Sequence, residues 1–121
     1  MTKLKFFCFR QNNSGGHFVV DDKVTQNVII EARDAYQANM IAQGMLGIYF
    51  NGCDDGTDCS CCGDRWYPVD GEGDDEPLLY GKPVKQGVQR AWFASPGSPI
   101  CYIYHFDGTK ETILQPAKEA A

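Results

Sequence analysis

One stretch of the sequence has the spacing of an amphipathic helix, and strand-like segments flank it on both sides. Apolar or small residues recur there at three- and four-residue intervals: Ala35, Ala38, Ile41, Ala42, Met45 and Leu46. Asp34 suits the N-terminus of a helix and Gly47 suits a C-terminal stop. We therefore expect one main helix, beginning at about residue 34 and ending before residue 47.

Three strands are expected before this helix. Side chains of residues 4–10 divide between two faces, with Leu4, Phe6 and Cys8 on one and Lys5, Phe7 and Phe9 on the other. Residues 17–20 form a plausible returning strand, and residues 24–31 alternate well enough for a third. Residues 11–16 contain Gln, Asn, Ser and Gly and therefore predict a turn or an exposed loop.

A hairpin is expected near the C-terminus. Residues 100–106 and 109–114 are rich in strand formers and flank Asp107-Gly108, a pair that suits a tight turn with positive φ. Weaker strands are expected at residues 78–80 and 89–94, and a frayed tail at residues 115–121. This order of elements predicts an α+β fold, in which a small antiparallel or mixed sheet packs one helix on a face.

The length of 121 residues fits a single domain over residues 1–121. No stretch approaches the roughly 20 apolar residues that cross a bilayer, and the apolar run near the N-terminus is too short for a secretory signal. We therefore expect the chain to stay in the cytoplasm where it is made and to contact no membrane. Thiols are kept reduced there, so the six cysteines suggest metal ligands, buried side chains or reactive thiols before disulfides.

Residues 51–77 lack any periodicity and are expected to form one long acidic, cysteine-rich loop. Loops of this length in a small domain are usually functional, metal-stabilised or disordered. Residues 54–76 hold nine acids and one arginine, a net charge of −8; because the whole chain carries −5, the remainder carries +3. Such a segment repels nucleic acid and attracts a basic protein surface.

The candidate partner-binding residues lie in the second half of this loop. They are five acids, Asp70, Glu72, Asp74, Asp75 and Glu76, together with Arg65 and Trp66. Like charges at this density repel, so we expect residues 70–76 to be mobile until a partner orders them and to contribute little to folding. Tryptophan is a frequent interface anchor, and the alternative is that Trp66 and Trp92 cap the core.

Four of the cysteines lie within ten positions of this loop: Cys53, Cys59, Cys61 and Cys62. Cys59 and Cys62 have the C-x-x-C spacing at which two thiolates reach one tetrahedral zinc ion, and Cys53 is the expected third ligand. Candidates for the fourth are Cys8, Cys101, His17, His105 and a nearby Asp, with Cys8 preferred. The alternative is that all of these cysteines are reduced thiols in a turn-rich loop.

No catalytic motif is recognisable. His17 and His105 are the only histidines, and neither lies near a nucleophile motif such as G-x-S-x-G. Walker and Rossmann glycine patterns are absent, and acids spaced at two residues over 70–75 do not satisfy the EF-hand pattern. A non-enzymatic binding role is therefore expected. A deep pocket with convergent histidine and carboxylates would favour a small hydrolase or nucleotide-handling enzyme instead.

Three segments together carry a resemblance: QNNSGG at residues 11–16, GIYFNG at 47–52 and DCSCCGDRW at 58–66. They resemble a family of small proteins of unknown activity that tailed bacteriophages encode, over roughly the first two thirds of the chain. The resemblance implies a phage accessory protein that occupies a protein of the infected bacterium, or else a minor component of the virion. It implies no catalytic residues.

Overall fold

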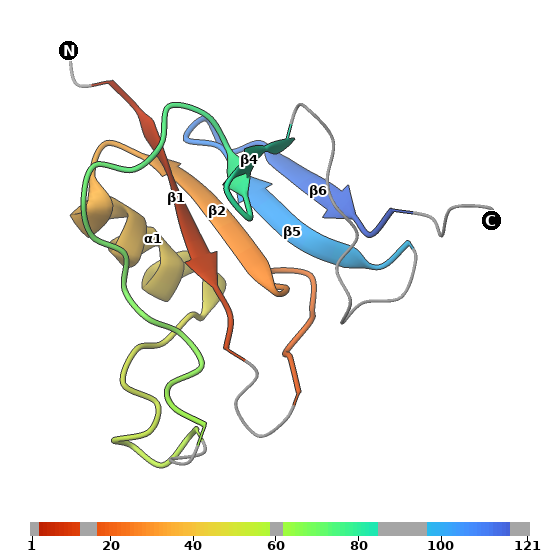
Figure 1. The fold of residues 1–121 in the computed structure, drawn as a ribbon. Coiled ribbons are helices and arrows are strands. Elements are labelled where there is room, and N and C mark those ends of the chain that lie inside the picture. Colours follow the sequence, from red (N-terminus) through yellow and green to blue (C-terminus); the bar gives the residue numbers. More distant parts are fainter. Residues whose placement is uncertain (1–2, 13–16, 59–61, 85–96, 117–121) are drawn as a thin grey trace.

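Four strands form a mixed sheet in the order β1-β2-β5-β6, and helix α1 packs on one face of it (Figure 1). The computed structural model describes residues 3–12, 17–58, 62–84 and 97–116. The bounds of the sheet strands are β1 (Lys5–Arg10), β2 (Asn27–Ala32), β5 (Pro99–Tyr104) and β6 (Lys110–Leu114). β1 and β2 pair antiparallel, β2 and β5 parallel, and β5 and β6 antiparallel. The predicted α+β class with a mixed sheet is confirmed.

The helix predicted from the sequence is α1 (Ala35–Leu46). Asp34 caps its N-terminus, because the side-chain Oδ1 accepts a hydrogen bond from the backbone N–H of Gln37 at 2.8 Å. Gly47 ends it with φ 71°, a left-handed conformation that glycine adopts without steric cost. Both ends of the helix are therefore determined by local sequence.

The sheet separates two apolar cores. Phe7 and Phe9 of β1 point to the side of α1, whereas Phe6 and Cys8 point to the opposite side, as their alternation in the sequence predicts. A small hairpin of β3 (Leu78–Leu79) and β4 (Lys82–Pro83) supplies Leu79 to the second core. Both faces of β2 are thus buried, since Val28 and Ile30 pack in the first core and Ile29 packs in the second.

The strand expected at residues 17–20 does not form, and this prediction was wrong. The side chain of Gln11 takes the place of a strand partner: its Oε1 accepts from the backbone N–H of Val19 at 2.6 Å, and its Nε2 donates to the Val19 carbonyl at 3.0 Å. Residues 21–23, which we call the strap, then cross β5 and β6 on the α1 side. The third expected strand begins later than predicted, at Asn27.

The C-terminal hairpin is confirmed as β5 and β6. Its turn closes where the His105 N–H donates to the Thr109 carbonyl at 2.8 Å, and Gly108 adopts φ 95°. The expected fraying does not begin at Gln115, which is buried and exchanges backbone hydrogen bonds with Gly97 and Ser98. The rest of the expected tail after residue 116, and the strand expected at 89–94, lie outside the described residues.

In the described part of the chain, no helix combines the length and the apolar character that spanning a bilayer requires.

Candidate functional site

A buried arginine holds the cysteine-rich loop together. Arg65 Nε lies 3.8 Å from Asp58 Oδ1, and the two side chains are only 7% and 1% exposed. Asp58 also accepts hydrogen bonds from the Tyr49 hydroxyl and from the backbone N–H of Arg65, both at 2.7 Å. The carboxylate of Asp58 therefore fastens the loop to the segment that follows α1.

The same guanidinium ties the loop to the residue that follows β1 and to residue 17. Arg65 Nη1 donates to Gln11 Oε1 and to the carbonyl of His17, both at 2.9 Å. Asn12 adds a backbone hydrogen bond to the Arg65 carbonyl at 2.8 Å and a side-chain hydrogen bond to the Cys62 carbonyl at 2.7 Å. Buried polar groups paired in this way specify one conformation. A polar network thus orders the part of the loop that the structure describes.

The cysteines expected to bind zinc lie in different surroundings. Cys8 packs in the second core, where burial raises its pKa to about 11. Cys53 is half-buried, and its backbone N–H donates to Asp64 Oδ1 at 2.9 Å, while Cys62 is exposed. Desolvation and the neighbouring Asp64 raise the pKa of Cys53 to about 11.

No three His, Cys, Asp or Glu side chains gather as a metal-binding group among residues 3–12, 17–58, 62–84 and 97–116. Cys8, the preferred fourth ligand, therefore does not join Cys53 and Cys62 there. Cys59, on which the C-x-x-C depends, and Cys61 lie outside the described residues. The zinc hypothesis accordingly stays a proposal.

The acidic segment, residues 70–76, is attached to the edge of β1. Asp74 and Phe6 exchange two backbone hydrogen bonds of 2.9 Å, so the segment adds one bridge to the sheet. Asp75 pairs with Lys5 and, at 3.2 Å, with Lys3; these ammonium groups lower the pKa of Asp75. The segment therefore has a defined position at the edge of the sheet, and its expected small contribution to folding stays a prediction.

The carboxylates of this segment differ in exposure. Asp70, Glu72 and Asp75 are exposed, whereas Asp74 and Glu76 are half-buried. Among the described residues, the side chains of Asp70 and Glu72 have no partner. The segment therefore presents negative charge from a fixed position.

Arg65 and Trp66 do not lie at the surface beside these acids. Arg65 is inside the network described above, and Trp66 is 2% exposed in the core beneath α1. Their assignment as partner-binding residues is corrected accordingly, because both side chains are already enclosed. Trp66 caps the core, which was the alternative interpretation, and Trp92 lies outside the described residues.

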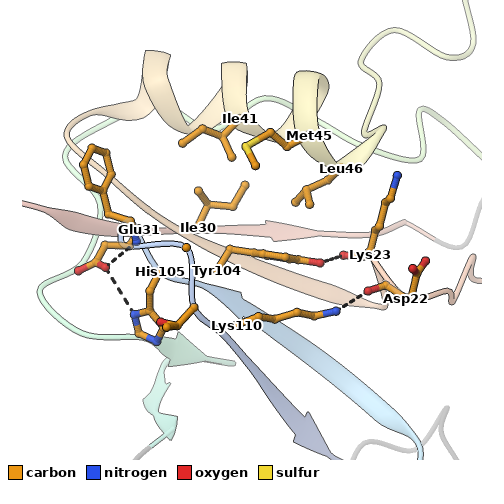
Figure 2. A pocket seen from close by; sticks show the side chains of 13 residues that line it. Asp22, Lys23, Ile30, Glu31, Ile41, Met45, Leu46, Tyr104, His105 and Lys110 are labelled. Atoms are coloured by element: carbon orange, nitrogen blue, oxygen red, sulfur yellow. Dashed lines mark hydrogen bonds and ion pairs between the residues drawn. The ribbon is translucent and has the colours of Figure 1, made fainter.

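A pocket of about 360 Å³ lies between α1 and the β5–β6 hairpin (Figure 2). Its apolar wall consists of Ile30, Ile41, Met45, Leu46, Tyr104 and Phe106. Helix α1 packs over β2, and β5 and β6 lie to its side (Figure 1). Met45, placed on the core-facing side of the helix by its spacing, lines the pocket and is 69% exposed.

The strap closes the other side of the pocket, held by the sheet. The hydroxyls of Tyr102 and Tyr104 donate to the carbonyls of Asp21 and Lys23, and the ammonium of Lys110 donates to the carbonyl of Asp22. Lys110 Nζ also stands 4.0 Å from the centre of the Tyr102 ring. Burial raises the pKa of Tyr104 to about 12, so its hydroxyl stays protonated as a donor.

His105 lies beside the pocket, but its ring turns away from the apolar wall. Nδ1 is 3.4 Å from Glu31 Oε1, and Nε2 is in contact with Glu111. The imidazole lies across the sheet from Ile41 and Met45 (Figure 2), packed edge-on against the ring of Phe6. The hydrogen bond to Glu111, followed by the interaction with Glu31, raises the pKa of His105. Each ring nitrogen of His105 therefore has a carboxylate as its partner.

No sequence pattern could have located this pocket. Its residues come from the strap, β2, α1 and the hairpin turn, and each has a local role that its own segment explains. Met45 and Phe106 are the exposed apolar side chains that mark the pocket, but a sequence does not show which side chains are exposed.

Fold and site define a small α+β domain with one helix on a mixed sheet, an apolar pocket at the helix edge and an ordered acidic segment. The chain belongs to the family described as a domain of unknown function (DUF7296), whose family model matches residues 4–120. Neither a curated protein nor a solved structure matches the chain.

Proposed function

We propose that this protein is a non-enzymatic accessory protein of a tailed bacteriophage that binds a bacterial host protein with a basic surface in the host cytoplasm. The observation that supports it best is the attachment of the acidic segment to β1. Preorganised charge loses less conformational entropy on binding than a mobile segment does. Its fixed acids also steer a basic partner toward one face.

The test compares two variants that remove the same charge from different places. Asp70→Ser with Glu72→Ser removes two exposed carboxylates from the acidic segment, and Asp22→Ser with Glu111→Ser removes two exposed carboxylates from outside residues 54–76. The tagged proteins are used to capture partners from infected cells at about 50 mM and about 500 mM salt, which differ in screening. We expect one bacterial protein to be captured at low salt by the wild type and the control pair, and to be lost from the Asp70/Glu72 pair. Equal capture by both pairs would assign binding to another surface.

A small hydrolase or nucleotide-handling enzyme is the second candidate, because His105 and two carboxylates adjoin a pocket. A general base needs a nitrogen that can reach the substrate proton, and both nitrogens of His105 face carboxylates instead. The binding role is preferred for this reason. Turnover of a generic ester or phosphoester by the wild type, lost in His105→Gln, would reverse the preference.

We further propose a structural zinc ion at the cysteine-rich loop. The C-x-x-C spacing of Cys59 and Cys62 supports it, with Cys53 as the third ligand. The polar network around Arg65 already orders the neighbouring residues, so the ion would stabilise the tip of the loop.

A further inference from the structure

The pocket beside α1 has walls that exclude most polar ligands. Its polar groups are engaged within the protein: Tyr104 and Lys110 with the strap, Glu31 with the backbone N–H of Phe106 at 3.0 Å, and Thr109 with Asp107. A sugar or a nucleobase buried there would leave its own hydrogen-bonding groups unpaired. The wall therefore favours an apolar ligand.

At one end of the pocket lies a charged side chain that can pair with a ligand. Lys23 extends from the strap toward the C-terminal end of α1, beside Leu46, whereas the Asp22 carboxylate lies on the outer side of the strap (Figure 2). Among the described residues, the Lys23 ammonium has no partner, since the hydrogen bonds of this residue are made by its backbone. An anionic group at this end of a ligand would pair with it.

The volume of the pocket limits the size of the apolar part of the ligand. At about 30 Å³ for a group the size of a water molecule, 360 Å³ holds about a dozen methylene-sized groups. Met45 stands exposed at the opening, and its unbranched side chain can adapt to a ligand of irregular shape.

We propose that the pocket between α1 and the β5–β6 hairpin binds a single-chain amphiphile, an alkyl chain of about ten carbons that ends in a carboxylate paired with Lys23. The site is separate from the acidic segment, and the proposal does not rest on the host-protein role. The strap belongs to the site, because it carries Lys23 and is fastened by Tyr104 and Lys110.

The experiment is calorimetric titration of the full chain with decanoate, 1-decanol and butyrate below the micellar range. We expect saturable binding of one decanoate, weaker binding of decanol and none of butyrate. Lys23→Gln should weaken decanoate binding about fivefold to tenfold and leave decanol unchanged, while Lys82→Gln, an exposed lysine on β4, should change neither.

Ile41→Trp, which fills the pocket, should abolish binding of both ligands. If that variant unfolds, the methyl resonances of Ile30, Ile41 and Leu46 in the wild type locate the ligand instead. Equal binding of decanoate by Lys23→Gln, or unsaturable uptake, would overturn the proposal. So would a pocket occupied by an acidic, leucine-bearing peptide or by a second copy of the chain with no binding of decanoate.

Discussion

Arg65 Nε lies 3.8 Å from Asp58 Oδ1 inside the cysteine-rich loop, and both side chains are buried. Replacing one member of such a pair leaves the other charge buried without compensation, which typically costs about 3–5 kcal/mol. We expect Arg65→Met to lower the free energy of unfolding by about 3 kcal/mol in urea denaturation.

Two further variants check that this cost comes from the pair. Arg33→Met, at an exposed position, should change stability by less than about 0.5 kcal/mol. Adding Asp58→Asn to Arg65→Met should cost less than the sum of the single effects, because a neutral amide leaves no buried charge. Additive losses would show that the pair is not coupled.

Gly73 allows the acidic segment to approach β1. A Cβ there would lie 2.9 Å from Phe7 and 3.0 Å from the Phe6 carbonyl, and φ is 72°. Gly71 has a similar φ of 79° but no neighbour within 4 Å. We expect Gly73→Ala to destabilise the fold by at least about 1 kcal/mol more than Gly71→Ala, measured by thermal unfolding. Equal losses would mean that the segment moves away from β1 without cost.

The hydrogen bond to Glu111 and the interaction with Glu31 raise the folded-state pKa of His105, so they stabilise the fold when the imidazole is protonated. This contribution is fully present below the ordinary pKa of histidine, about 6.5, and is lost as the pH rises through the raised value. Asp107, whose pKa His105 helps to lower, is the other carboxylate nearby.

An NMR titration of the His105 ring should show a larger fall of its pKa in Glu111→Gln than in Glu31→Gln. Urea curves should show the wild type losing stability relative to Glu111→Gln as the pH rises above about 6.5 and through the raised pKa of His105. An unchanged His105 pKa in both variants would contradict the arrangement at the hairpin turn.

The proposed zinc site is checked by elemental analysis of protein purified without a histidine tag. We expect near-stoichiometric zinc in the wild type and loss of zinc in Cys59→Ser and Cys62→Ser. Because zinc binds thiolates and displaces their protons, affinity should fall on acidification. A folded, metal-free protein with all six thiols titratable would exclude the site.

Local sequence determined the elements whose partners lie a few residues away. The helix follows from the spacing of Ala38, Ala42 and Leu46 between its two caps, and the hairpin follows from strand formers on both sides of Asp107-Gly108. The two faces of β1 were also predictable, because side chains alternate along any strand. Hydrogen bonds and burial within one segment decide these features.

Tertiary structure alone decided the site. Whether Arg65 is buried depends on Gln11 and His17, and whether residues 70–76 are held depends on the edge of β1. The prediction of a strand at residues 17–20 was wrong for the same reason. The side chain of Gln11, from another segment, makes the hydrogen bonds with the backbone of Val19 that a strand partner would make. The pocket is a space left between α1, the strap and the hairpin. Such features depend on contacts between residues far apart in the chain, and the pattern of a single segment contains no information about which distant groups will meet it.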